Sequence, residues 1–312
     1  MFDDLSPNVA WALVGIYAIL VVASVVTFAL VRLLPGRNFH ELVLRVQSWW
    51  VMVTLFSLAM VLSRRGALVF LGFVSFLALK EYLSLIPTRR TDRRVLLWAY
   101  LAIPVQYYWV AAERYGFFII WVPVYMFLLL PAIMIVHSGT QGFLRAAGSL
   151  HWGLMACVFS LSHAAFLLVL PDSGNPVAGG AGWLLFLVFL TQANDVGQYL
   201  WGKALGRTKA APEVSPGKTV EGFLGGLGTT TVLALAIAPL LTPFDWRFSA
   251  VAGLIIGFSG FIGDVTISAI KRDLGVKDSG SLLPGHGGIL DRVDSLTYTA
   301  PLFFHYVYYF YY

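Results

Sequence analysis

The stretch VAWALVGIYAILVVASVVTFALV, from Val9 to Val31, decides the fold class, because its 23 residues include no charged side chain. A helix needs roughly 20 apolar residues to cross the hydrocarbon core of a bilayer. Similar runs recur along the 312 residues, of which 58% are apolar, and the mean hydropathy is +0.77. Backbone amides in lipid must be hydrogen-bonded within the chain, and these runs are too long and continuous for barrel strands. The sequence therefore predicts an all-α, polytopic integral membrane protein.

About ten membrane-spanning helices are expected from these runs. The second run is short, and the interfacial stretch from Glu41 to Trp50 indicates that its helix begins earlier. The expected spans are Val9–Val31, Trp49–Leu62, Ala67–Ile86, Val95–Ala112, Phe117–Val136, Leu150–Leu170, Trp183–Asn194, Phe223–Leu241, Phe248–Gly263 and Val293–Tyr312.

Basic residues are distributed unevenly over the loops between the runs. With the N-terminus outside, sixteen of them fall in inner loops, and the outer loops hold four, Arg64, Arg65, Arg114 and Arg247. By the positive-inside rule, the charged C-terminal segment faces the cytoplasm. We expect the membrane to be the inner membrane of a bacterium. The first span follows acidic residues and is expected to be retained rather than cleaved as a signal peptide. The net charge of +5 is explained in this way, and no nucleic-acid partner is expected.

Charged residues make up only 12% of the chain, about half the proportion of an ordinary soluble domain. A dense group of them therefore indicates chemistry, and both dense groups lie in the second half of the sequence. We expect residues 1–149 to be membrane helices with a packing and lipid-facing role. Residues 150–312 are expected to be membrane helices that carry a cytoplasm-facing catalytic site.

The segment SAIKRDLGVKDSGSLLPGHGGILDRVD, from Ser268 to Asp294, contains nine ionisable side chains. Asp264, Ser268 and Lys271 follow one another at i, i+4 and i+7, which places an acid, a hydroxyl and a base on one face of a helix that leaves the membrane. A carboxylate near membrane depth is costly unless it is paired or bound to a cation. We therefore interpret Asp264 as a functional residue.

Cations and glycines occur together through the same segment. Lys271, Arg272 and Lys277 supply positive charge, and glycines such as Gly287 and Gly288 let the backbone approach a ligand closely. A glycine-rich loop before a helix N-terminus is suited to phosphate. His286, which lies between two of the glycines, can bind phosphate, donate a proton or cap the turn, and the sequence leaves these roles open.

Asp291 and Asp294 stand three residues apart, with Arg292 between them. On the last helix, which Ile289 to Asp294 is expected to open, the two carboxylates would point to the same side. Carboxylates beside phosphate-binding cations fit a Mg²⁺ site in which substrate phosphates and water complete the coordination shell.

A second polar group follows the seventh expected span. Gln192, Asp195, Gln198 and Tyr199 share one helical face there. The following loop, expected on the same side of the membrane, contributes Ser215, Lys218, Thr219 and Glu221. Its GKT triplet is not read as a nucleotide-binding P-loop, because Pro212 stands where that motif needs glycine and no strand is expected before it.

Together the two polar groups resemble the CDP-diacylglycerol synthase, or phosphatidate cytidylyltransferase, family of integral membrane enzymes. The pattern SP-x-KT-x-EG-x-x-GG is echoed by Ser215 to Gly226, and LKEYLSL at Leu79 to Leu85 is a weaker echo. The resemblance covers roughly the C-terminal 120 residues. The C-terminal family signature is matched at its spacing by Ser268, Lys271, Arg272, Lys277, Asp278, Pro284, His286, Gly287, Gly288, Asp291, Arg292 and Asp294.

The resemblance implies a Mg²⁺-dependent condensation of CTP with phosphatidic acid, which yields CDP-diacylglycerol and pyrophosphate in a homodimer set among membrane lipids. It assigns the metal to Asp264 and Asp291 and leaves a second, monovalent cation open. The candidate catalytic residues are Lys271, Arg272, Lys277, Asp278, His286 and Arg292. The candidate substrate-binding residues are Asp195, Tyr199, Ser215, Lys218, Thr219, Glu221, Ser268, Gly287, Gly288 and Asp294.

Several positions depart from the family pattern and indicate a divergent branch. Ile267 stands where a glutamate is common, Gln198 where alanine is usual, and Gly217 and Val220 replace a common lysine and tryptophan. Another membrane lipid phosphate therefore remains open as the acceptor. A transporter of a phosphorylated solute is the alternative from another class, but it does not explain why the charges gather on one side of the membrane.

Overall fold

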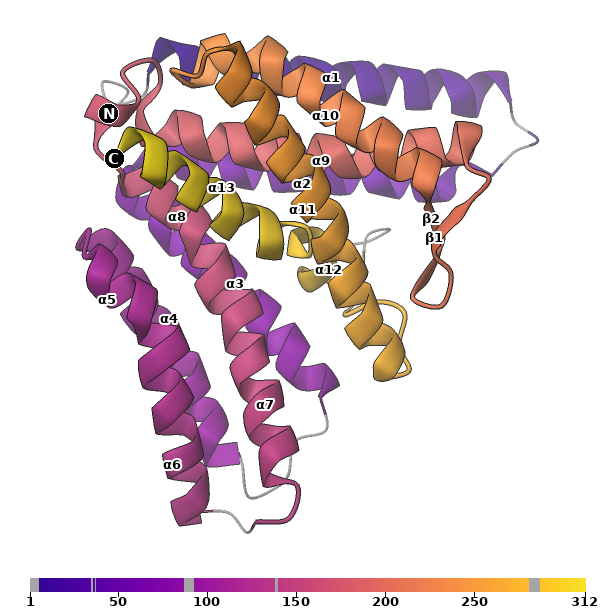
Figure 1. The fold of residues 1–312 in the computed structure, drawn as a ribbon. Helices are drawn as coiled ribbons and strands as arrows, with labels where there is room; N and C mark the ends of the chain where they lie inside the picture. The colour runs from indigo at the N-terminus through magenta and orange to yellow at the C-terminus, as the bar shows by residue number, and fades with distance from the viewer. Residues whose placement is uncertain (1–5, 35, 37, 87–92, 138–139, 281–286) are drawn as a thin grey trace.

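The structure is a computed structural model that describes residues 6–34, 36, 38–86, 93–137, 140–280 and 287–312, so His286 lies outside the described residues. Helices make up nearly all of it (Figure 1). They are α1 (Pro7–Leu33), α2 (His40–Leu62), α3 (Arg64–Leu85), α4 (Arg93–Ala111), α5 (Tyr115–Ile120), η2 (Trp121–Met126), α6 (Phe127–His137), α7 (Phe143–Leu154), η3 (Met155–Ser160), α8 (Leu161–Val169), η4 (Asp172–Gly174), α9 (Gly179–Leu205), α10 (Val220–Leu241), α11 (Trp246–Asp273), α12 (Leu290–Val293) and α13 (Leu296–Tyr311).

Seven helical stretches in the described part of the chain are long and apolar enough to cross a membrane. Two of them are composite, since Tyr115–Val136 joins α5, η2 and α6, and Phe143–Val169 joins α7, η3 and α8. The three other expected spans also lie in helices, in α4, α9 and α13. The all-α, polytopic fold is thereby confirmed, and α2 begins at His40, well before Trp49, as its interfacial lead-in indicated.

Both chain termini lie at the same end of the molecule (Figure 1). Ser6 Oγ donates to the carbonyl oxygen of Val177 at 3.1 Å there, and Tyr312 Oη donates to that of Pro171 at 2.8 Å. From this end the helices diverge in two groups, one with α9 and α10 and the other with α4, α6 and α7 (Figure 1). The charged segment of the sequence lies at the opposite end.

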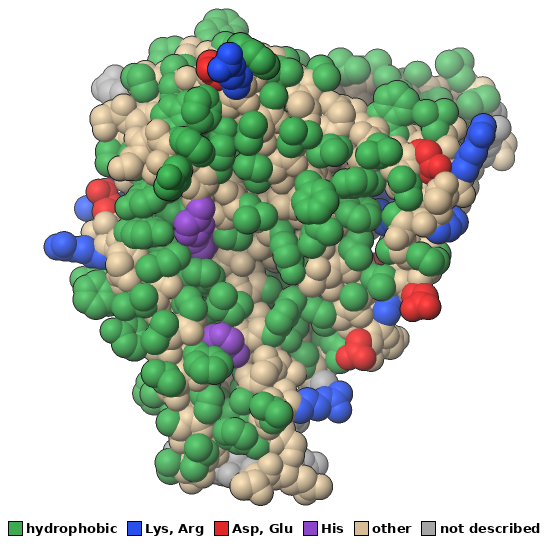
Figure 2. Space-filling view, viewed as in Figure 1, with side chains coloured by type: hydrophobic (Ala, Val, Ile, Leu, Met, Phe, Trp, Pro, Cys, Tyr) green, Lys and Arg blue, Asp and Glu red, His purple; other side chains and the backbone are tan. Residues whose placement is uncertain are grey.

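The outer surface of the helices is mostly apolar, as a surface in contact with lipid must be. Figure 2 shows hydrophobic side chains over most of one face, with charged side chains mainly toward its edges. Only 11% of an apolar 18-residue window of α1 is buried, whereas 78% of such a window within Phe143–Val169 is buried. The composite helix α7–η3–α8 therefore forms part of the centre of the molecule, and α1 faces the bilayer.

Helices α9, α10 and α11 pack closely through glycines, and this packing brings the polar residues together. A Cβ atom on Gly222 of α10 would lie 2.8 Å from the carbonyl oxygen of Gln198 in α9. Between the three helices, buried Asn194 accepts from Thr230 Oγ1 at 3.1 Å and donates to the carbonyl oxygen of Gly257 at 3.2 Å. Small residues and interhelical hydrogen bonds are the usual means of helix association in membranes.

A two-stranded antiparallel hairpin, β1 (Lys209–Ala211) and β2 (Ser215–Thr219), connects α9 to α10. The sequence indicated no strand here, and the GKT triplet lies in β2. Glu221 stabilises the hairpin, because its carboxylate accepts from the backbone amides of Arg207 at 3.0 Å and Thr208 at 3.1 Å. Thr219 Oγ1 caps α10 by accepting from the amide of Gly222 at 3.1 Å.

Candidate active site

Asp264, in the last third of α11, forms an ion pair with Lys218 of β2. The side chains of both residues are 20% exposed. Lys218 Nζ also donates to Gln198 Oε1 at 3.1 Å, and Ser268 Oγ donates to Asp264 Oδ1 at 3.3 Å. The hairpin thus folds back onto α11 and joins the two polar groups that the sequence singled out.

Two further carboxylates, of Asp195 and Asp294, belong to the same cluster. Burial raises the pKa of Asp294 well above its ordinary range, and the charges of Asp264 and Asp195 raise it further. Ser295 holds both acids, since its amide donates to Asp294 Oδ1 at 2.8 Å and its hydroxyl donates to Asp195 Oδ1 at 2.9 Å. A Cβ atom on Gly263 would lie 2.7 Å from the carbonyl oxygen of Asp294, so the glycine permits this close approach of α11.

Lys218 is the cation that these three carboxylates share. Burial alone lowers the pKa of its ammonium group, but the charges of Asp264, Asp195 and Asp294 outweigh burial and raise the pKa. Lys218 therefore remains charged at neutral pH. Three carboxyl groups crowd beside one lysine in a poorly solvated place, and a further cation would stabilise their ionised forms.

The donor set of this cluster, which we call the Asp264 cluster (Asp195, Lys218, Asp264 and Asp294), fits Mg²⁺. No three His, Cys, Asp or Glu side chains in the described ranges are placed to hold a metal ion on their own. Mg²⁺ commonly takes one or two protein carboxylates and completes its shell with substrate phosphates and water. The crowded carboxyl oxygens suit a cation bound in that way.

Asp291 and Lys271 form a second, more deeply buried ion pair. Lys271 Nζ lies 2.6 Å from Asp291 Oδ1, and the two side chains are 11% and 5% exposed. The other carboxylate oxygen accepts from the amide of Ser279 at 2.8 Å, from Ser279 Oγ at 3.0 Å and from the amide of Gly288 at 3.0 Å. Burial would raise the pKa of Asp291, but Lys271 and these amides outweigh it, so the pKa is lowered. Gly287 has a φ of +78°, which only glycine adopts readily.

Glu81 of α3 is a site residue that sequence reasoning missed. Its Oε1 accepts from the amide of Ile289 and its Oε2 from the amide of Leu290, both at 2.9 Å. Ser279 Oγ lies 3.0 Å from the same Oε2. The weak echo LKEYLSL was the available signal, because Glu81 is its acid. A residue of the first 149 therefore holds the loop that precedes Asp291.

We expect Glu81→Gln to weaken the attachment of Ser279, Ile289 and Leu290 to α3. The amide keeps one acceptor but turns an N–H₂ group toward a backbone N–H, and the charge is lost. Hydrogen exchange at the amides of Ile289 and Leu290 should become about tenfold faster, as followed by mass spectrometry. Glu113→Gln, in an exposed ion pair with Arg64 at the other end of the molecule, is the control. Unchanged exchange at both amides would refute the role of Glu81.

Asp291 and Asp294 do not lie on one continuous helix, in contrast to what the sequence indicated. The helix breaks after Val293, and α13 begins at Leu296. The break is stabilised by Asp294, whose carbonyl oxygen accepts from Thr297 Oγ1 at 2.6 Å. Asp291 therefore pairs with Lys271 while Asp294 joins the Asp264 cluster. That Asp264 and Asp291 share a metal stays a prediction.

The other candidate residues differ in their burial and in their hydrogen-bond partners. Glu221 and Thr219 have structural partners in the hairpin and α10, as described above. Arg272 Nε donates to the carbonyl oxygen of Val214 at 3.2 Å, which ties the hairpin to the end of α11. The residues with exposed side chains are Tyr199, Arg272, Lys277 and Asp278. Ser215, in β2, is half-buried, and Arg292 has a buried Nε without a hydrogen-bond partner among the described residues.

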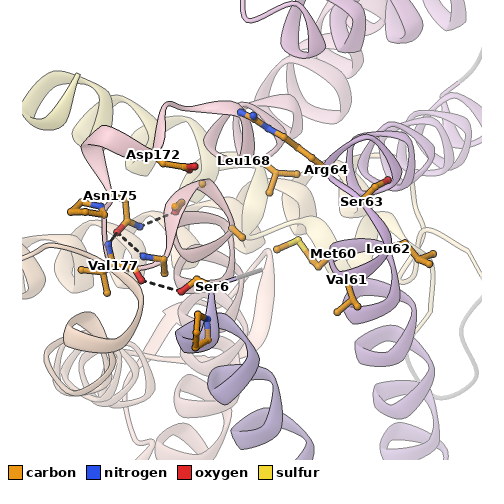
Figure 3. A pocket seen from close by; sticks show the side chains of 16 residues that line it. Ser6, Met60, Val61, Leu62, Ser63, Arg64, Leu168, Asp172, Asn175 and Val177 are labelled. Atoms are coloured by element: carbon orange, nitrogen blue, oxygen red, sulfur yellow. Dashed lines mark hydrogen bonds between the residues drawn. The ribbon is translucent and has the colours of Figure 1, made fainter. Parts of the chain in front are cut away.

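A cavity of about 750 Å³ lies at the end of the molecule that carries the termini (Figure 3). Its lining includes Ser6, Arg64, Asp172 and Asn175, and none of the candidate residues from the sequence borders it. A smaller cavity, of about 310 Å³, is lined by Gln198, Lys218 and Ser215 beside the Asp264 cluster. Size alone does not locate the site, and the smaller cavity is the one that the candidate residues border.

Comparisons with known proteins identify the family of the chain. The sequence profile of a family described as the cytidylyltransferase family matches residues 43–310. A protein of Escherichia coli (strain K12) named YnbB, described as uncharacterised, is 45% identical over 298 residues, which are 96% of this chain and 98% of that protein.

Two relatives with an assigned activity match the chain over a shorter region. A phosphatidate cytidylyltransferase of Synechocystis is 50% identical over 116 residues, which are 37% of this chain and 39% of that enzyme. A phosphatidate cytidylyltransferase of Haemophilus influenzae is 46% identical over 132 residues, which are 41% and 46% of the two chains. The match spans less than half the length of either enzyme. The family profile nevertheless covers most of this sequence, so the chain belongs to the cytidylyltransferase family and is a membrane-embedded nucleotidyltransferase.

Proposed function

We propose that the protein condenses CTP with phosphatidic acid, in a Mg²⁺-dependent reaction that yields CDP-diacylglycerol and pyrophosphate for phospholipid synthesis. The Asp264 cluster is the observation that carries this proposal. It combines a partly buried lysine, several carboxyl groups and a neighbouring cavity at one end of the membrane helices. Such a place suits a divalent cation and the phosphates of a nucleotide.

In this proposal Asp264 and Asp291 hold Mg²⁺, with Asp195 and Asp294 nearby. Mg²⁺ bound there neutralises charge on the triphosphate and orients it. A second, monovalent cation would offset the carboxylates that remain. Since Asp291 has Lys271 and two backbone amides as partners in the structure, its oxygens are already fixed in direction before any ligand enters.

The bond changes are those of a phosphoryl transfer. An oxygen of the lipid phosphate attacks the α-phosphorus of CTP in line, the bond to the β-phosphate oxygen breaks, and pyrophosphate leaves. The attacking oxygen is already anionic, so positioning and charge neutralisation matter more than a general base. Buried Lys271 and half-buried Lys218 and Arg292 provide positive charge inside the site, and the exposed Arg272 and Lys277 provide charge at its rim.

The same proposal places the site on the cytoplasmic side of the bacterial inner membrane, where CTP is available. Two features support this orientation. The sequence places most basic residues in loops expected on one side of the membrane, and the hairpin and the end of α11 belong to those loops. A homodimer is part of the proposal and rests on the family resemblance.

The test is a product assay with the purified protein in detergent. With radiolabelled CTP, Mg²⁺ and phosphatidic acid, we expect a labelled liponucleotide, and EDTA should abolish it until excess Mg²⁺ is added back. Omitting the lipid controls for simple CTP hydrolysis. Absence of a liponucleotide with phosphatidic acid, together with its formation from another lipid phosphate, would correct the acceptor. Absence with every lipid phosphate would refute the proposed reaction.

A further inference from the structure

The larger cavity, of about 750 Å³, lies where several membrane helices begin or end. Its lining includes Leu62 at the end of α2, Arg64 at the start of α3 and Gly179 at the start of α9 (Figure 3). Gln198, in the lining of the smaller cavity, follows Gly179 by 19 residues of the same helix, which places it about 28 Å away. This distance is close to the thickness of the hydrocarbon core, so the two cavities belong to opposite faces of the membrane.

Two charged residues of opposite sign border the larger cavity. Arg64 and Asp172 are the only ionisable side chains among the described residues that line it. Figure 3 shows Arg64 extending from α3 over the cavity toward the segment that carries Asp172. Arg64 forms an exposed, weak pair with Glu113 at 3.6 Å, and Asp172 belongs to none of the ion pairs between described residues. The two charges therefore stay apart, and each can take an opposite charge.

The wall that carries Asp172 is held in one conformation by its own hydrogen bonds. Asn175 is fully buried, and its Nδ2 donates to the carbonyl oxygens of Gly179 at 2.8 Å and Leu241 at 2.9 Å. Its Oδ1 accepts from the amide of Val177 at 3.2 Å. A Cβ atom on Gly179 would lie 2.7 Å from Asp172 Oδ1, which places the carboxylate against the start of α9. Because this segment is already ordered, a ligand that binds Asp172 does not have to order it.

Apolar side chains make up much of the remaining lining. Met60 and Leu168 are 6% and 7% exposed, and Leu62 is 49% exposed. A volume of about 750 Å³ is in the usual range of small-molecule sites. Apolar surface beside one cation and one anion, at the ends of membrane helices, suits the headgroup of a phospholipid together with the first carbons of its chains.

We propose that this cavity binds a phospholipid of the leaflet opposite the Asp264 cluster, with a headgroup that carries a phosphate and a primary ammonium group. Arg64 binds the phosphate, since a guanidinium group can donate two parallel hydrogen bonds to it, and Asp172 binds the ammonium. The lining carries one charge of each sign, so it matches a zwitterionic headgroup better than an anionic one. The inference does not rest on the proposed reaction, because the cavity lies on the other face of the membrane.

The test measures competition between two lipids that share a phosphate and differ in the ammonium group. Protein in detergent, without CTP or Mg²⁺, is incubated with equal amounts of phosphatidylethanolamine and phosphatidylglycerol of identical chains, and native mass spectrometry counts the bound lipids. The ratio of bound phosphatidylethanolamine to phosphatidylglycerol should be about fivefold higher in the wild type than in Asp172→Asn. Asp172→Glu keeps the charge and should keep most of the preference. Arg64→Gln should lower the binding of both lipids.

Asp245→Asn and Arg247→Gln are the matched controls, because both residues are exposed at the start of α11 and neither lines the cavity. Both should bind the two lipids as the wild type does. Equal lipid ratios in the wild type and Asp172→Asn, or the same fall in Asp245→Asn, would overturn the proposal. Free phosphoethanolamine in tenfold excess should leave the bound lipid in place, because it has no chains to contact Met60 and Leu168. Displacement by it would overturn the assignment to a lipid and indicate a water-soluble ligand.

Discussion

Replacing Asp264 by asparagine is expected to lower liponucleotide formation at least about 10³-fold. The substitution keeps the shape of the side chain but removes its charge from the ion pair with Lys218 and from the proposed metal site. A loss of this size corresponds to about 4 kcal/mol of transition-state stabilisation, which is typical when one preorganised charge contact is removed. Initial rates at saturating CTP and lipid measure it.

Asp245→Asn is the matched control, because Asp245 caps the opposite end of the same helix. Its Oδ1 accepts from the amides of Arg247 at 2.8 Å and Phe248 at 2.9 Å, and asparagine caps helices about as well. This variant should retain activity and stability. Near wild-type turnover in Asp264→Asn would remove Asp264 from the chemistry.

Asp291→Asn is expected to destabilise the protein by about 3 kcal/mol as well as to abolish turnover. It leaves the ammonium group of Lys271 buried without its counter-charge, and breaking a buried pair in this way commonly costs 3–5 kcal/mol. The double variant Lys271→Met/Asp291→Asn removes both charges and should regain most of the stability. It should remain inactive, because the proposed site needs both charges. Unfolding in detergent and turnover are the two measurements.

An exposed ion pair provides the control for that experiment. Glu41→Gln in α2 breaks the pair between Glu41 and Arg45, whose side chains are 72% and 41% exposed, and should change stability by only a few tenths of a kcal/mol. Recovery of activity in the double variant would show that the pair is only structural.

The lowered pKa of Asp291 also makes the stability of the protein depend on pH. The stability that this carboxylate contributes is present above the ordinary carboxyl pKa and is lost as the pH falls through the lowered value.

The membrane fold could be predicted because long apolar runs have one structural solution in lipid. The run from Val9 to Val31 became α1, and the polar stripe of Asp264, Ser268 and Lys271 was correctly assigned to the end of a helix. Local periodicity was sufficient in both cases. The same reasoning failed at Asp294, because it assumed that the helix continues through Ser295.

Contacts between distant segments could not be predicted in the same way. Glu81 lies 208 residues before Ile289. Nothing in local spacing indicates that α3 approaches Ile289 and Leu290. The sequence likewise placed Glu221 with the substrate, whereas its carboxylate binds backbone amides of the hairpin. Gln198 stood out as a departure from the family pattern, but only the fold shows its contact with Lys218.

The central claim is that Asp264 holds a divalent cation that joins the phosphates of CTP. Electron paramagnetic resonance of Mn²⁺, used in place of Mg²⁺, tests it most directly when wild-type protein and Asp264→Asn are titrated with and without CTP. We predict that CTP strengthens Mn²⁺ binding to the wild type, with phosphorus coupling in the spectrum, and that Asp264→Asn weakens that binding at least about 100-fold. Equal Mn²⁺ affinity and identical spectra in the two proteins would contradict the claim.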